Sequence, residues 1–136
     1  IMIAHSFQGA EFGPAQRLHG ATYAVEAEFR ADQLDPPTQM VENGMEKTEL
    51  RQLLDTIDYS NLDDNPALQG INTTTEFMAF HIFEMLAAAC RDGRLGAGGY
   101  NVTGLKVLLR EAPTAWAART PSAGCVRSSR RSGRSR

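Results

Sequence analysis

The stretch Arg17-Leu18-His19-Gly20-Ala21-Thr22-Tyr23 leads into a segment in which apolar and polar residues alternate with a period of two. Because neighbouring side chains of a strand point to opposite faces, the alternation from Thr22 to Arg30 predicts a half-buried strand. Its apolar face takes every second residue, namely Tyr23, Val25, Ala27 and Phe29. By the same spacing, positions 19, 21 and 23 point to one side of the chain.

Three further segments are predicted to be strands. Ile1–Phe7 is short, apolar and β-branched, and can pair in antiparallel fashion with the strand just described. The connection between them, Gln8–Leu18, contains glycine and proline and is predicted to be a loop. After a glycine-rich loop, apolar residues at 105, 107 and 109 alternate with polar ones and predict a third strand, and Thr114–Ala118 can form a fourth.

Two helices are predicted between these pairs of strands. The first starts near Glu46 and places Leu50, Leu53, Leu54 and Ile57 on one side. The second starts at a capping box, with Thr73 as N-cap and Glu76 three residues later. The order strand, strand, helix, helix, strand, strand predicts an α+β fold, a four-stranded antiparallel sheet with two helices on one face.

Length and composition are those of one globular domain. The chain has 136 residues, of which 42% are hydrophobic and 22% charged. No apolar run is long enough to span a membrane, so no membrane association is expected. Cys90 and Cys125 lie in unlike contexts, which argues against a disulfide framework and favours a reducing, cytoplasmic location.

The charge of the chain is unevenly distributed. Residues 1–118 are predicted to form the domain, and residues 119–136 a Ser/Arg-rich tail with six arginines and no acidic residue. Such a tail cannot bury apolar area and is predicted to be disordered. The domain carries eight basic and sixteen acidic residues, so nucleic acid is not an expected partner.

The opening stretch resembles the Leu-His-Gly-His-x-Tyr signature of the 6-pyruvoyl-tetrahydropterin synthase family, which includes the 6-carboxy-tetrahydropterin synthases. In that family both histidines of the signature bind a catalytic zinc, and a third comes from the end of the first strand. His19 matches the first signature histidine and His5 the one on the first strand, while Ala21 stands in place of the second. Two imidazoles alone seldom hold zinc tightly, so no cofactor is expected. Zinc held with a substitute ligand such as Glu11 is the alternative.

Two catalytic groups that the resemblance implies are also replaced. The family has a cysteine shortly before the first signature histidine, where this chain has Gly13-Pro14-Ala15-Gln16. It also has an Asp-His pair in Leu-Asp-His-x-x-Leu-Asn, where this chain reads Ile57-Asp58-Tyr59-Ser60-Asn61-Leu62-Asp63. A phenol is a poor base at neutral pH. Asp58 and Tyr59 are therefore weak candidates for a catalytic role, and a capped turn is the alternative.

The ligand-binding residues that the resemblance implies are retained. Glu111 matches the carboxylate that anchors pterin, whose ring N–H and exocyclic amine can both donate to it. Thr74, Thr75 and Glu76 match the segment beside that anchor, although capping of the second helix explains the same residues. For Glu76, capping is the preferred interpretation.

The resemblance implies the tunnelling fold, in which three subunits join their sheets into a barrel and two trimers form a homohexamer. The leading hypothesis is a homologue that keeps a pocket for a pterin or purine-like ligand but is not an active synthase. A second is an active 6-carboxy- or 6-pyruvoyl-tetrahydropterin synthase that acts on dihydroneopterin triphosphate with substitute groups. A third, of another class, is a non-catalytic ligand sensor or scaffold.

Overall fold

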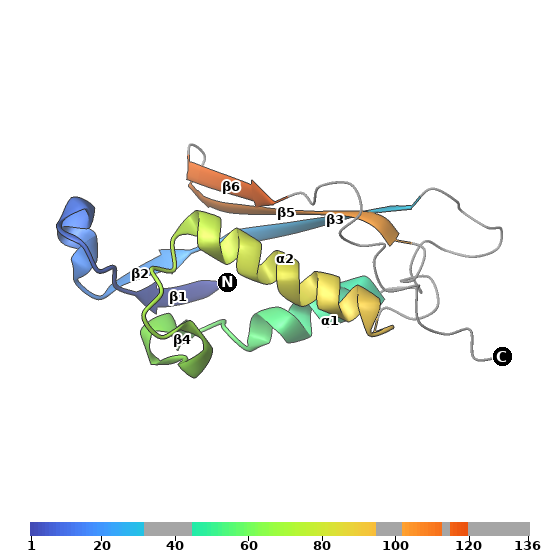
Figure 1. Cartoon of the computed structure of the whole chain (residues 1–136), viewed down its shortest axis with the longest axis horizontal. Helices are drawn as coiled ribbons and strands as arrows, with labels where there is room; N and C mark the ends of the chain where they lie inside the picture. Colours follow the sequence, from blue (N-terminus) through green and yellow to red (C-terminus); the bar gives the residue numbers. More distant parts are fainter. Residues whose placement is uncertain (32–44, 95–101, 113–114, 120–136) are drawn as a thin grey trace, which may run out of the picture.

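The computed structural model of the chain describes residues 1–31, 45–94, 102–112 and 115–119. The strands are β1 (Met2–His5), β2 (His19–Thr22), β3 (Ala24–Ala31), β4 (Ser60–Asn61), β5 (Val102–Ala112) and β6 (Ala115–Arg119). The helices are α1 (Met45–Asp55) and α2 (Thr75–Arg91), with short 3-10 segments η1 (Ala10–Gln16), η2 (Leu62–Asp64) and η3 (Pro66–Leu68). The α+β class is confirmed, and so is the order of the main elements along the chain (Figure 1).

Hydrogen bonding divides the strands into two sheets of three, with the orders β2-β1-β4 and β3-β5-β6. The sequence predicts one four-stranded sheet instead. The division falls at Tyr23, which separates β2 from β3 and donates its backbone N–H to the Ile1 carbonyl at 2.8 Å. β1 pairs antiparallel with β2 and parallel with the two-residue β4, which the sequence pattern did not predict.

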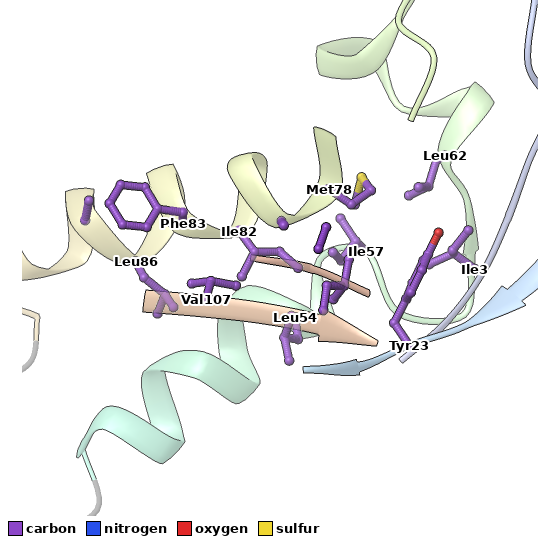
Figure 2. Packing of buried hydrophobic residues seen from close by; sticks show 14 of the residues in the cluster. Ile3, Tyr23, Leu54, Ile57, Leu62, Met78, Ile82, Phe83, Leu86 and Val107 are labelled. Carbon is purple, nitrogen blue, oxygen red and sulfur yellow. The ribbon is translucent and has the colours of Figure 1, made fainter. Parts of the chain in front are cut away.

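The larger sheet and α2 enclose the core. On β5, the alternate residues Leu105, Val107 and Leu109 are buried, as their spacing predicts, and they face Phe29, Ala27 and Val25 of β3 in register. Both helices lie on the same side of this sheet, with α2 next to β5 and β6 and α1 packed against α2 (Figure 1). Figure 2 shows Ile82 and Leu86 of α2 pointing toward Val107.

One local prediction is wrong. Gln8–Leu18 is not loop throughout, because it contains the 3-10 segment η1, which Gly13 interrupts with a φ of 53°. The predicted fourth strand is present as β6, which extends one residue past Ala118 to Arg119, where it pairs with Val107. The rest of the predicted tail, most of the glycine-rich loop before β5 and the turn at Pro113 lie outside the described residues.

Neither of the helices within the described ranges combines the length and apolar character needed to cross a membrane.

Candidate functional site

Three consecutive threonines before and at the start of α2 have three different partners. The Thr73 hydroxyl lies 2.9 Å from Nδ1 of His5. The Thr74 hydroxyl caps the helix, and the Thr75 hydroxyl donates to Oε2 of Glu111 at 3.3 Å. His5 ends β1 and Glu111 lies near the end of β5. The start of α2 therefore connects a residue of each sheet.

The capping residue is Thr74 and not Thr73, so the predicted register of the cap is wrong by one position. Thr74 has an extended backbone, and its hydroxyl accepts from the Phe77 N–H at 3.3 Å. Thr73 is buried, and its hydroxyl contacts Nδ1 of His5. Glu76 then lies in the first turn of α2, one position too early for a capping box. The helix dipole still favours its negative charge at this position.

His5 and His19 form a pair of imidazoles on the smaller sheet. They are opposite each other in the β1–β2 register, and their ring centroids are 4.6 Å apart. Nδ1 of His19 lies 2.8 Å from the Arg17 carbonyl, which can only accept, so this nitrogen carries the hydrogen. His5 is 2% exposed, and burial, followed by the proximity of His19, lowers its pKa. Both rings use Nδ1 for hydrogen bonds, which leaves the two Nε2 atoms for other partners.

These residues do not fit the catalytic zinc that the resemblance implies. A catalytic zinc site takes three protein ligands, and His5 and His19 supply only two. Ala21 lies opposite Ile3, and its methyl group packs against the hydrophobic core. Within residues 1–31, 45–94, 102–112 and 115–119, no three His, Cys, Asp or Glu side chains are placed to hold a metal ion.

Aromatic rings pack against the imidazole pair, and the carboxylates of Asp63 and Glu111 act on His5 from further away, where they oppose the lowering of its pKa. The ring of Phe7 lies 4.6 Å from that of His5 and 5.5 Å from that of His19. Phe12, from η1, packs against Phe7 with ring centroids 5.0 Å apart. The predicted substitute ligand Glu11 lies on the same segment, with its exposed carboxylate folded back over Gly9.

Glu111 is exposed at the end of the buried face of β5. The strand register shifts between Arg110 and Ala112, directly beside it. One carboxylate oxygen accepts from Thr75, so the other oxygen and the remaining lone pair of Oε2 can accept from a ligand. Such an exposed carboxylate, held by one hydroxyl at a helix start, can accept from two adjacent N–H donors of a planar ring.

Asp58 and Tyr59 lie elsewhere, at the opposite end of β1 from His5. Oδ1 of Asp58 accepts from the N–H groups of Met2 at 2.9 Å and Tyr59 at 3.0 Å, and Oδ2 contacts Arg51 at 2.7 Å. The Met2 hydrogen bond and Arg51 lower the pKa of Asp58. Tyr59 is 82% exposed, with a φ of 53°. Since β1 runs from Met2 to His5, about 10 Å of strand separates this cluster from the imidazoles.

No thiol is found near the imidazoles within the described residues. The segment that matches the family's cysteine position, Gly13–Gln16, belongs to η1 and carries none. Cys90 is buried in α2, where desolvation raises its pKa to about 11, so it stays a thiol at neutral pH. Cys125 lies outside the described residues.

Two further residues of the site were not predicted from the sequence. Asp63 binds the end of β1 through the Ser6 N–H at 3.2 Å and the Ser6 hydroxyl at 2.5 Å. Tyr23 is 2% exposed, and burial raises the pKa of its phenol, while Thr75 acts in the opposite direction. Its place in the same-face series 19, 21 and 23 was a signal that could have identified it.

Two histidines with a lowered pKa predict how stability depends on pH. Burial lowers the pKa of both His5 and His81 from 6.5, and His81 also stacks on Phe77. Above pH 6.5 their contribution to stability is complete, and it is lost as pH falls through their folded pKa values. We expect the free energy of unfolding to fall between pH 7.5 and 5.5, with a slope of at most about 1.4 kcal/mol per pH unit for each group.

Urea unfolding at several pH values measures this slope. His81→Gln should reduce the slope and leave the part that belongs to His5. An unchanged slope in the variant would contradict the assignment to His81.

Comparison with known proteins places this arrangement in context. Residues 1–122 match the family model described as 6-pyruvoyl tetrahydropterin synthase. The structure is similar to 6-pyruvoyl tetrahydropterin synthase of Caenorhabditis elegans, with 22% identity, a TM-score of 0.69 and 89% of each chain covered. It is also similar to that of Plasmodium vivax, with 16% identity, a TM-score of 0.66 and coverage of 88% of this chain and 90% of the other. A search of curated protein sequences finds no match.

Proposed function

The chain belongs to the 6-pyruvoyl tetrahydropterin synthase family, whose model matches residues 1–122, and from this membership we propose that it binds a pterin-type ligand through Glu111. The observation that carries the proposal is the hydrogen bond between Thr75 and Glu111 at the start of α2. It holds an exposed carboxylate beside the segment that also supports His5. The ligand class is a 2-amino-4-oxo heterocycle, either a pterin or a purine-like compound.

The chemistry of recognition follows from the carboxylate. The ring N–H and the exocyclic amine of such a heterocycle are two adjacent donors, and a carboxylate can accept from both. Hydrogen bonds of this charge-assisted kind are about twice as strong as neutral ones. A ring that lacks the amine would use only one of the two oxygens, which provides selectivity between related heterocycles.

We further propose that the protein is not a synthase of the usual kind. Three features support this: Ala21 supplies no third imidazole, Gly13–Gln16 supplies no thiol, and Tyr59 replaces the expected histidine. The hydrogen bonds of Asp58 to Met2 and Arg51 add to this support, because an aspartate with a lowered pKa is a weak base. Two of the family's proton-transfer groups would thus be missing and the third weakened.

Assembly into the trimeric barrel and hexamer is also part of the proposal. In the sheet β3-β5-β6, β3 and β6 are the outer strands, and outer strands offer backbone groups for pairing with another copy. The outer face of β3 carries the charged residues Glu26, Glu28 and Arg30, which suits a water-filled interior better than a dry interface. Light scattering during size-exclusion chromatography would measure the mass of the assembly.

The alternative is an active synthase with substitute groups. One Plasmodium vivax structure carries alanine in place of a catalytic glutamate, so a carboxylate takes part in catalysis in that protein. Glu11 is a candidate for a substitute group here, although it would have to turn away from Gly9 to reach a substrate. A role as a ligand sensor or scaffold would share the binding step and lack the reaction.

One set of measurements on a single preparation of the full chain separates these functions. Fluorescence titration with 2-amino-4-oxopteridine should show binding, and 2,4-dioxopteridine, which lacks the amine, should bind more weakly. Metal analysis should find well under one zinc per subunit, and dihydroneopterin triphosphate should remain unconverted. Absence of binding would overturn the proposal, and one zinc per subunit together with product formation would favour the alternative.

A further inference from the structure

Residues 7–16 form a loop with a well-attached base. The Phe7 N–H donates to the Ala15 carbonyl at 3.0 Å, and this hydrogen bond closes the loop. Beside it, Asn72 forms two hydrogen bonds with the backbone of Gln8. Its Oδ1 accepts from the N–H at 2.8 Å, and its Nδ2 donates to the carbonyl at 2.9 Å. The base is therefore fixed both to itself and to the segment before α2.

The part of the loop from Gly9 to Gly13, here called the arm, is held much less firmly. Among the described residues, no hydrogen bond joins Ala10–Gly13 to a residue outside Gly9–Gln16. No side chain of η1 is buried, and in Figure 1 this segment projects at one end of the molecule, beyond β1 and β2. The half-buried ring of Phe12 joins the arm to the base through its contact with Phe7, at 5.0 Å between centroids.

Both ends of the arm are glycines in backbone conformations that favour glycine. Gly9 has a φ of 130°, and Gly13 a φ of 53° with a ψ of -125°. Glycine changes φ and ψ at low steric cost, and a few such residues at the ends of a segment can act as hinges. One aromatic contact is a small fraction of the stability of a domain. The arm can therefore move as a unit when the contact between Phe12 and Phe7 breaks.

The ring of Phe7 lies between the arm and the imidazole pair. Its centroid is 4.6 Å from that of His5 and 5.5 Å from that of His19. The core cluster of the described residues includes neither Phe7 nor Phe12, so the core does not hold these rings. Both imidazoles form hydrogen bonds through Nδ1, which leaves Nε2 as the nitrogen that a solute could reach.

We propose that Phe7 and Phe12 form a gate to the imidazole pair, in which Phe7 is the covering ring and Phe12 the latch. With the arm closed, Phe12 holds the ring of Phe7 against the two imidazoles. When the arm swings about its two glycines, the side chain of Phe7 is free to turn away, and the Nε2 atoms become accessible. The backbone of Phe7 stays in place, because its N–H is bonded at the base.

Acylation of histidine by diethyl pyrocarbonate, measured for each residue by mass spectrometry, tests the gate. It needs no ligand, so its result is independent of the proposed function. Phe12→Ala should raise the acylation rate of His5 by about 3- to 10-fold, the factor that corresponds to the loss of one aromatic contact. His81 lies on α2 and is the internal reference, with an unchanged rate. Phe12→Tyr keeps the ring and should react like the wild type.

Gly13→Ala is a second variant, and it leaves every aromatic ring in place. A Cβ at position 13 meets no atom within 4 Å, so the substitution strains the closed arm only through the positive φ. Gly70→Ala is the matched control, because Gly70 also has a positive φ, of 73°, and open space around a Cβ, but lies outside the loop. The acylation rate of His5 should rise in Gly13→Ala and stay unchanged in Gly70→Ala.

Two further measurements separate the covering ring from the latch. Phe7→Ala should raise the rate of His5 at least as much as Phe12→Ala, and combining the two should have no further effect. In the wild type, the Phe12 N–H bonds to the Gly9 carbonyl within the arm at 3.1 Å. Its amide should exchange with solvent at least about 10-fold faster than that of Phe7 at the base, after correction for intrinsic rates.

An unchanged rate at His5 in both Phe12→Ala and Gly13→Ala would overturn the proposal. A rise of equal size at His81, or in Gly70→Ala, would show a general loss of structure and would also contradict a gate. Equal exchange of the Phe7 and Phe12 amides would show that arm and base open together, so that Phe12 is no latch.

Discussion

Glu111→Gln is expected to weaken binding of 2-amino-4-oxopteridine by about 100-fold, because one charge-assisted hydrogen bond is lost and the other becomes a neutral one. The glutamine amide offers one acceptor oxygen and turns an NH2 group toward a second donor of the ligand. Donor then faces donor, so one contact disappears and the other loses its charge. Titration by fluorescence or calorimetry, at a pH near neutral and in one buffer, measures the change.

Glu76→Gln is the matched control for this experiment. Glu76 is also exposed, lies one residue after Thr75 and carries the same charge, but no hydrogen bond to Thr75 or Tyr23 involves it. Its replacement should change the affinity less than about 2-fold, the range typical of exposed charges outside an interface. Equal affinities of wild type and Glu111→Gln would show that the ligand does not use this carboxylate. Equal losses in both variants would point to a general effect of negative charge.

The strands and helices that bury an apolar face could be predicted from the sequence. The alternation of Leu105, Val107 and Leu109 holds in the structure because α2 covers this face of β5, and that of Val25, Ala27 and Phe29 holds because these side chains pack against the same core. The helix from Met45 was predicted within one residue of its start. The spacing of the apolar residues is enough for these predictions, because it indicates which side chains become buried.

The partners of the polar residues could not be predicted in the same way. Thr73 fits the sequence signature of an N-cap, but His5, 68 residues away, takes its hydroxyl, and the cap moves to Thr74. Asp58 fits the position of a catalytic pair, but it lies against Met2 and Arg51. Local propensity does not contain these contacts, which arise only when β1 packs beside the segments after α1 and before α2.

The division of the sheet at Tyr23 has a related cause. Its apolar side chain continues the alternation of β3, so the pattern gives no sign of a break. Its backbone N–H, however, bonds to Ile1, whereas Ala24 already pairs with Arg110 of β5. The side chain of Tyr23 thus continues the apolar face of β3, while its backbone bonds to the neighbouring sheet and not to β5.

Ala21→His is expected to create a zinc site, and this is the second large effect. Positions 19 and 21 point to the same side of β2, and His5 lies directly opposite His19 on β1. An imidazole at 21 would thus join the two existing rings on one face. Three imidazoles with an open fourth position form a catalytic type of zinc site. We expect zinc to bind at least about 100-fold more tightly than in the wild type, as a third ligand changes an incomplete site into a complete one.

The substitution is also expected to lower the stability of the fold, because the methyl group of Ala21 packs against the core and a larger ring must be accommodated there. Ala21→Phe has similar bulk and no nitrogen, so it separates the effect of size from that of ligation. Zinc affinity is measured by competition with a chromogenic chelator, and zinc should raise the melting temperature of Ala21→His alone. Without a gain in affinity over wild type and Ala21→Phe, the imidazoles of His5 and His19 would not converge on a common point. In that case the arrangement of β1 and β2 would prevent zinc binding, and not the absence of an imidazole at position 21 alone.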